Sequence, residues 1–195
     1  MTNPPRIAHL NPPYGDAEGK ALGRMMPKDS PVEPLKLFRT FARNLPFATA
    51  IGPLGGYMLS LGRDGGAGYD LRSRELVIDR VTARCGCEYE WGVHIASYAR
   101  RAELTEEQIY ATVHSGPDDP CWDDRDSAVL SMVDELHDTG KLTDATFDAL
   151  RRHFDERRII ELFALAGWYH AISYVANGSR TELEDWAPRF PARRA

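Results

Sequence analysis

Residues 75–94 read ELVIDRVTARCGCEYEWGVH and contain two helical segments separated by a glycine. Within residues 73–84, the apolar side chains of Leu76, Ile78 and Val81 recur near the helical period, which predicts an amphipathic helix. Gly86 interrupts this pattern. Helical spacing resumes over residues 88–102. We therefore predict two consecutive helices that meet at the glycine.

Helical signals also cover most of the chain beyond residue 34. Thr105 and Gln108 have the spacing of a capping box. Gly140 suits the left-handed C-cap of a helix. Asp155 opens the longest predicted helix. No stretch shows the alternation of apolar and polar residues that is typical of strands. These features predict an all-α fold.

Composition divides the chain into three parts. Residues 1–34 hold seven of the thirteen prolines and are predicted to form an extended, proline-rich N-terminal arm. Residues 35–180 contain the helical signals and are predicted to be one domain, which is long enough to bury a core. Residues 181–195 form a C-terminal tail. Its basic end, PRFPARRA, is short and interrupted by prolines, so we expect it to be solvated.

The overall composition is that of a soluble globular protein, with 43% hydrophobic and 27% charged residues. A formal net charge of −5 and the lack of a Lys/Arg run argue against nucleic-acid binding. No apolar run reaches the ~18 residues that a membrane span needs, and the first residues do not resemble a signal peptide. Three cysteines are too few for a disulfide framework. We therefore expect a cytoplasmic protein without membrane or nucleic-acid partners.

Glu90 and His94 are four residues apart, so both project from one face of the predicted helix. A carboxylate beside an imidazole raises the pKa of the histidine and orients its ring, which suits acid/base chemistry near neutral pH. On a solvated surface, the same pair would contribute only about 0.2–0.5 kcal/mol to helix stability. Trp91 and the apolar residues of this helix place the segment against the core, which favours a functional site.

Cys87 and Cys85 are candidates for redox thiols, but each also fits the core as a small apolar side chain. Side chains two positions apart face different sides of a helix, so a bond between the two thiols needs a turn at Gly86. A helix N-terminus favours the Cys87 thiolate by about 0.3–1 kcal/mol. The acidic residues at positions 88 and 90 oppose it. We expect a weakly activated thiol.

The segment ELVIDRVTARCGCEYEWGVH resembles the motif of the alkylhydroperoxidase D-like (AhpD-like), or carboxymuconolactone decarboxylase, family. The peroxidase branch of that family has a glutamate followed by Cys-x-x-Cys-x-x-x-His over two consecutive helices. Glu75 matches the glutamate, Cys87 the first cysteine and His94 the histidine, whereas Glu90 occupies the place of the second cysteine. The segments LFRTFARN, GPLGGYMLS and GWYHAISYVAN resemble a decarboxylase-like branch of the same family.

This resemblance implies an AhpD-like helical bundle that forms homo-oligomers, either trimers or hexamers. It also implies a carboxymuconolactone decarboxylase-like enzyme that acts on a small carboxylated or lactone-like molecule without a cofactor. In that hypothesis His94 transfers the proton, and Glu75 and Glu90 tune it or relay protons to it. Cys87 is a further catalytic candidate.

Other residues are assigned to substrate binding or to packing. Trp91 and His170 are predicted to bind the substrate, whereas Tyr169 is expected to pack in the core. An anionic substrate needs a nearby cation, and the sequence does not rank the three candidates Arg39, Arg80 and Arg84.

Two other functions stay open at this point. A thiol peroxidase would use Cys87, with Cys85 or a separate thiol as the resolving group. The retained motif residues favour this reading, and the loss of the second motif cysteine counts against it. A non-catalytic, oligomeric ligand-binding protein is equally compatible with the fold, because fold alone does not define function.

A metal site is the weakest alternative. Glu75, Glu90, His94 and His170 offer adequate ligands for zinc or iron. However, helical di-iron sites use two Glu-x-x-His motifs, and the chain has only one Glu-x-x-x-His variant. The paired cysteine motifs of structural zinc are also missing. We therefore predict no metal.

Overall fold

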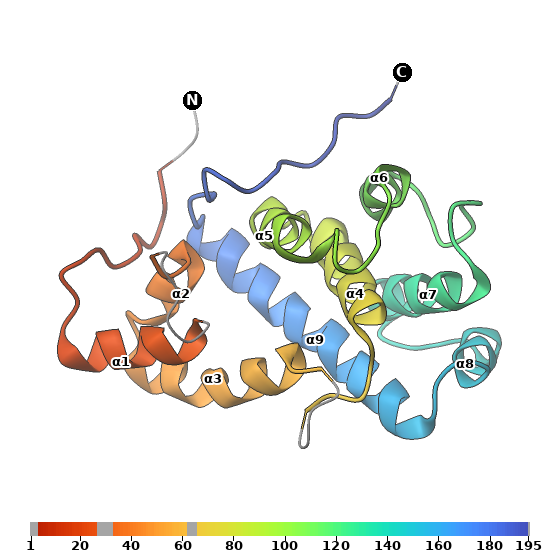
Figure 1. Cartoon of the computed structure of the whole chain (residues 1–195), viewed down its shortest axis with the longest axis horizontal. Helices are drawn as coiled ribbons and strands as arrows, with labels where there is room; N and C mark the ends of the chain where they lie inside the picture. Colours follow the sequence, from red (N-terminus) through yellow and green to blue (C-terminus); the bar gives the residue numbers. More distant parts are fainter. Residues whose placement is uncertain (1–3, 27–32, 62–65, 195) are drawn as a thin grey trace.

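The computed structural model describes residues 4–26, 33–61 and 66–194 (Figure 1). In these ranges the chain is helical apart from loops and one isolated β-bridge between Leu61 and Ala67, and the prediction of an all-α fold is confirmed. The helices are α1 (Asp16–Met25), α2 (Lys36–Phe41), α3 (Leu45–Leu59), α4 (Leu71–Arg84), α5 (Glu88–Tyr98), α6 (Glu106–His114), α7 (Asp124–Thr139), α8 (Asp144–Arg151) and α9 (Glu156–Ser179).

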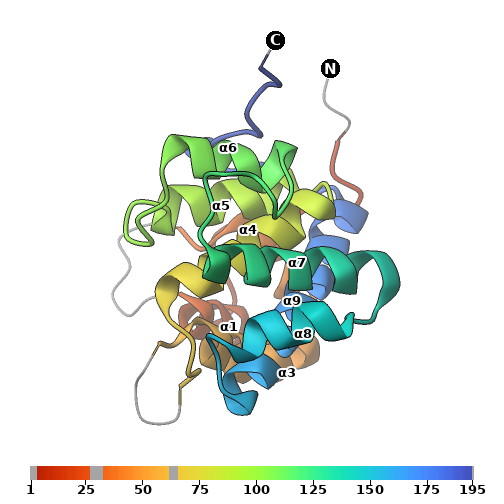
Figure 2. The ribbon, with the colours of Figure 1, turned by 90° about the vertical axis from the view of Figure 1, so that its right-hand side faces the viewer.

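Helix α4 lies at the centre of the bundle and contacts α5, α6, α7 and α9 (Figure 2). Residues 73–82 are all buried, including Arg74, Glu75, Asp79 and Arg80. The prediction of an amphipathic helix is therefore wrong for this segment, which is buried on every side. Burial of its charged side chains is possible where they pair, as Arg80 does with Asp134 of α7 at 2.6 Å.

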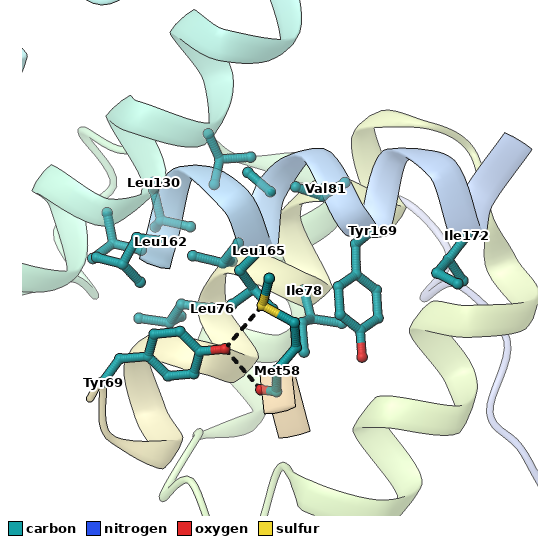
Figure 3. Packing of buried hydrophobic residues seen from close by; sticks show 14 of the residues in the cluster. Met58, Tyr69, Leu76, Ile78, Val81, Leu130, Leu162, Leu165, Tyr169 and Ile172 are labelled. Atoms are coloured by element: carbon teal, nitrogen blue, oxygen red, sulfur yellow. Dashed lines mark hydrogen bonds between the residues drawn. The ribbon is translucent and has the colours of Figure 1, made fainter. Parts of the chain in front are cut away.

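Helix α9 crosses the molecule beside α4 and also contacts α5 and α8 (Figure 1). Figure 3 shows the apolar contact between the two central helices, with Leu76, Ile78 and Val81 of α4 near Leu162 and Leu165 of α9. By length and composition α9 could cross a membrane, but half of its apolar window is buried inside the bundle. It is a core helix in this fold.

The predicted helix ends agree with the structure. Thr105 and Gln108 form the capping box of α6. Gly140 caps α7 in the left-handed region with φ 68°. The Asp155 side chain accepts the backbone N–H of Arg158, the third residue of α9. The side-chain oxygens of Thr105 and Asp155 thus satisfy backbone donors that a helix leaves unpaired.

The N-terminal arm differs from the prediction. Residues 16–25 form α1, which packs against α2 and α3 and buries Ala21 and Leu22. An extended arm is therefore the wrong description of this segment, because its two apolar side chains find a partner surface on the bundle. Residues 1–3 and 27–32 of the arm lie outside the described ranges.

The basic end of the C-terminal tail is mostly exposed, as predicted, but it lies along the surface of the bundle. Described up to residue 194, it runs across α5 and α6 (Figure 1), and the ring of Phe190 lies 5.2 Å from that of Trp91. A Cβ atom at Gly92 would lie 2.3 Å from the backbone oxygen of Pro188. The glycine in α5 therefore allows the tail to approach closely, and an aromatic contact stabilises it there.

Candidate active site

The candidate site is built around the imidazole of His94, where α4, α5 and α9 meet. Its Nδ1 lies 2.8 Å from Oε2 of Glu75. Its Nε2 lies 3.1 Å from the hydroxyl of Tyr169 and 3.5 Å from Oε1 of Glu90. All four side chains are buried. Both ring nitrogens of the histidine thus face groups that can exchange or share a proton.

The local chain path explains this convergence. Helix α4 ends at Arg84, and Gly86 adopts a left-handed conformation with φ 61°, which glycine adopts at little cost. The Cys87 N–H donates to the Thr82 carbonyl at 2.8 Å and closes the turn. Cys87 then serves as the N-cap of α5. This sharp turn lays α5 against α4, so that His94 faces Glu75.

Arg74 completes the charged group next to Glu75. Its Nε donates to Oε1 of Glu75 at 2.6 Å, and its Nη1 donates to the Leu59 carbonyl at 2.7 Å. The guanidinium lies 4.6 Å from the centre of the Tyr98 ring. Nη2 is buried and has no hydrogen-bond partner among the described residues. Nη2 therefore has N–H donors that no described group accepts.

The three arginines considered from sequence are engaged elsewhere. Arg80 binds Asp134 and two backbone carbonyls, and Arg84 pairs with Asp138. Arg39 donates to the Leu10 carbonyl and to the side chain at position 11. The cation beside the histidine is Arg74, which the sequence reasoning missed.

A third acidic side chain, Asp79, lies one helical turn beyond Glu75 and is completely buried. Neither of its oxygens has a hydrogen-bond partner in the described part of the chain. Burial, followed by the charge of Glu75, holds the pKa of Asp79 well above its ordinary value. Both effects favour the protonated, neutral form of this carboxyl group.

The electrostatics favour the protonated form of the histidine. Burial alone would lower the pKa of His94, but the charge and hydrogen bond of Glu75, together with Glu90, raise it to about 10. Burial raises the pKa of the adjacent Tyr169 hydroxyl far above its ordinary value. At neutral pH the histidine is therefore an imidazolium beside a neutral phenol, and the imidazolium is the acid of this pair.

Cys87 lies next to this group but is poorly activated. Burial raises the pKa of its thiol to about 12, against smaller opposite effects of the Glu90 backbone N–H and the Ser173 hydroxyl. Burial also raises the pKa of Cys85, and Ser173 again opposes it. Both thiols are free in the structure and protonated at neutral pH. This agrees with the weak activation expected from the sequence.

The structure does not bring Trp91 and His170 into the group around His94. The Trp91 side chain is buried toward α6, and its Nε1 donates to the Thr112 hydroxyl at 3.1 Å. The His170 ring instead contacts His137 of α7. Neither forms a described hydrogen bond or ring contact with His94. The prediction that they bind the substrate beside His94 has no support in this geometry.

Tyr169 packs in the core as expected, but its hydroxyl also approaches the histidine, which the sequence did not predict. The tyrosine follows the helical period of the apolar residues of α9, so the sequence alone marks it as a core residue. Arg74 and Asp79 have a sequence signal that was overlooked. They are charged residues on a segment otherwise rich in buried apolar side chains, and buried charges need partners.

The buried Glu–His pair, with a cysteine at the N-cap of the second helix, has the arrangement expected from the AhpD-like motif. Residues 52–129 match the model of the Carboxymuconolactone decarboxylase family, and this part of the chain is a domain of that family. The resemblance stated from the motif is thereby confirmed. No curated protein matches the chain.

Solved structures show the same fold over most of the chain. An uncharacterised peroxidase-related protein from Silicibacter sp. TM1040 superposes with a TM-score of 0.76 at 16% identity, covering 98% of this chain and 100% of the other. A protein of unknown function from Agrobacterium tumefaciens, linked by its description to AhpD antioxidant defence, has a TM-score of 0.61 at 22% identity, over 70% and 89% of the two chains. The debrominase Bmp8 has a TM-score of 0.69 at 15% identity, over 92% of each chain.

Proposed function

We propose that the protein is an acid/base enzyme that decarboxylates a small carboxylated or lactone-like molecule, with His94 as the proton donor. The observation that supports this most strongly is the position of the imidazole between Glu75 and Glu90, which raises its pKa to about 10. A histidine in this state is protonated across the physiological range. It can therefore deliver a proton to a carbanion, which is the species that loss of CO₂ creates.

Arg74 is the group that binds the substrate carboxylate or carbonyl in this proposal. Its Nη2 is buried and finds no hydrogen-bond partner in the described ranges, and the same holds for Oε2 of Glu90. A buried donor without a partner is costly, and an anionic ligand removes that cost. Glu75 holds both Arg74 and His94, so the anion-binding group and the acid have a common support.

In this proposal the decarboxylation proceeds in three steps at these groups. The bond between the carboxylate carbon and its neighbour breaks, and CO₂ leaves. The electron pair moves into an adjacent carbonyl to form an enolate. The Nε2–H of His94 supplies the proton to the carbon, and Glu75 keeps the Nδ1 proton and the ring orientation. After the transfer, a proton from solvent restores the Nε2–H, and Tyr169 and Glu90, which face this nitrogen, hold the ring in place.

A second candidate function is thiol chemistry at Cys87. Ser173 influences the thiols of both Cys85 and Cys87, and the charge of one affects the pKa of the other, so the two are close in space. A solved complex of Bmp8 with 2,3,4-tribromopyrrole used a variant of that protein with one cysteine replaced by alanine. Peroxide reduction and reductive dehalogenation are the two reactions of this type that we consider.

A panel of carboxylated lactones in D₂O distinguishes these functions. We expect CO₂ release with one deuterium incorporated at the former carboxyl carbon. His94→Gln should reduce this rate by roughly 100-fold or more, the ordinary contribution of a general acid, whereas Cys87→Ser should retain it. His153→Gln, an exposed histidine on another surface, is the matched control. Hydroperoxide or bromopyrrole turnover that requires Cys87 and survives His94→Gln would overturn the proposal.

The assembly and the compartment remain proposals as well. Large apolar side chains are exposed on α3 and α9, including Leu54, Ile160 and Tyr174, and they support the homo-oligomer implied by the family resemblance. The three free cysteines support a reducing cytoplasm. Light scattering on the purified protein tests the first point, with a trimer or hexamer expected and a monomer contradicting it.

A further inference from the structure

Three side chains that can bind a metal meet at the C-terminal end of α4, outside the group around His94. Cys85 is the C-cap of α4, His137 lies in the last turn of α7, and His170 is on α9. One donor atom from each lies within 4.8 Å of the other two, and all three residues are half-buried. Helices α7 and α9 both pack on α4, so the three residues are presented by a packed scaffold.

The hydrogen bonds of His170 orient a lone pair toward the other two residues. Its Nδ1 lies 2.9 Å from the Ala166 carbonyl, which can only accept, so Nδ1 carries the proton. Nε2 is then unprotonated in the neutral ring and faces Nδ1 of His137 at 2.9 Å. A histidine that donates its far N–H to a backbone carbonyl has the arrangement that orients metal ligands in proteins.

We propose that Cys85, His137 and His170 bind a zinc ion. One thiolate and two imidazoles match the ligand preference of zinc and exclude magnesium and calcium, which take oxygen ligands. Tetrahedral zinc, with bonds of about 2.0–2.3 Å, separates its ligand atoms by roughly 3.3–3.6 Å. The present spacing needs only small side-chain rotations to reach that geometry. Three protein ligands leave the fourth position for water or another small ligand.

The surroundings agree with this assignment. In the metal-free protein Nδ1 of His137 donates its proton to Nε2 of His170, and zinc takes the place of this proton between the two rings once it has moved to the other nitrogen of His137. The Asn177 amide donates to the Cys85 carbonyl at 2.9 Å and fixes the backbone of that residue. Zinc binding displaces the thiol proton of Cys85, so the affinity rises with pH until the thiol is ionised.

The zinc site has a consequence for the thiol pair. Only Gly86 separates Cys85 from Cys87 in the sequence, and the sulfur of Cys85 cannot bind zinc and form a disulfide at the same time. The bound metal therefore blocks Cys85 from acting as a resolving thiol. It leaves the Glu75–His94 pair unchanged, since none of the three ligands belongs to it.

Metal titration of the chelator-treated full-length protein tests the site. We expect one Zn²⁺ per chain, and we expect Co²⁺ to give a thiolate-to-cobalt charge-transfer absorption. Cys85→Ser should abolish that absorption, and His137→Gln should weaken Zn²⁺ binding by at least about tenfold. Cys121→Ser and His153→Gln replace a cysteine and a histidine outside the group and should leave both readouts unchanged.

Alkylation mapping provides a readout that needs no variant. Zn²⁺ should protect Cys85 from a thiol reagent and leave the reactivity of Cys121 unaltered. The proposal is overturned if the wild-type protein binds Co²⁺ without charge-transfer absorption, or if Zn²⁺ leaves Cys85 as reactive as before. Equal zinc affinity of Cys85→Ser and Cys121→Ser would also overturn the proposal.

Discussion

His94 Nδ1 and Glu75 Oε2 lie 2.8 Å apart in the interior of the bundle, with the glutamate completely buried. The same carboxylate accepts from Arg74 at 2.6 Å. The charge of Glu75 and its hydrogen bond both favour the protonated form of the neighbouring imidazole. The pair therefore holds a proton on the histidine in a place where burial alone would remove it.

The first prediction concerns the dependence of activity on pH. Glu75→Gln removes the charge that contributes most to the raised pKa of His94. The alkaline limit of a reaction that needs the imidazolium should move from about 10 toward lower pH, and the rate at neutral pH should fall. A rate profile between about pH 6 and 11 measures this shift. An alkaline limit unchanged in Glu75→Gln would show that another group titrates.

The second prediction concerns stability. The folded-state pKa of His94, about 10, lies above the ordinary 6.5, so the folded chain keeps a proton that the unfolded chain releases. The stabilisation is complete below pH 6.5 and disappears as the pH rises through 10. Between these values the free energy of unfolding should fall with a slope approaching about 1.4 kcal/mol per pH unit.

Urea unfolding at several pH values measures this slope. The His94→Gln variant should have a lower stability at neutral pH and a flatter profile above it, because it lacks the titrating ring. Parallel profiles of the wild-type protein and the variant would contradict a raised pKa at His94.

The third prediction concerns Asp79, whose pKa burial and the charge of Glu75 raise well above 3.8. The folded chain holds this proton to a higher pH than the unfolded chain, so stability is lost as the pH rises above 3.8 toward the folded-state pKa. Asp79→Asn keeps the shape and removes this penalty. The variant should therefore lose less stability than the wild-type protein as the pH rises above 3.8, and it should be the more stable of the two at pH 7. Urea unfolding of both proteins measures the difference. A variant less stable than the wild-type protein would indicate that the Asp79 carboxylate is ionised and has a partner.

The fourth prediction concerns the C-terminal tail. A Cβ at position 92 would lie 2.3 Å from the backbone oxygen of Pro188, so Gly92→Ala should cost about 1–3 kcal/mol or detach the tail. Gly167→Ala, in α9 with no atom near its Cβ position, is the matched control and should gain up to about 1 kcal/mol. Limited trypsin digestion measures how accessible the tail is, because the tail contains a cleavage site at Arg189. Equal cleavage of both variants would contradict the close approach.

The sequence predicted the helices and the turn well, because these depend on local signals. Thr105, Gly140 and Asp155 cap helices where their side chains or backbone freedom predict. The pair of Glu75 and His94 came from the motif. Its geometry follows from the turn at Gly86, which a sequence pattern can locate.

The remaining features depend on contacts between distant segments. Tyr169 has the spacing of a core residue, and only the approach of α9 to α5 shows that its hydroxyl faces His94. The same holds for His137 and His170, which are 33 positions apart and meet through the packing of α7 and α9 on α4. Helix α1 was not predicted, because the proline content of residues 1–34 indicated an extended chain. One short apolar contact with the bundle accompanies the helix.

The pKa of His94 itself is the most direct measurement of the central claim, and it needs no substrate. Histidine-labelled protein can be titrated by NMR, with His94→Gln identifying the resonance and Glu75→Gln serving as the test variant. We predict a value near 10 in the wild-type protein and a clearly lower one in Glu75→Gln. A value of 6.5 or below in the wild-type protein, unchanged in the variant, would contradict the account of His94 as a protonated acid held by Glu75.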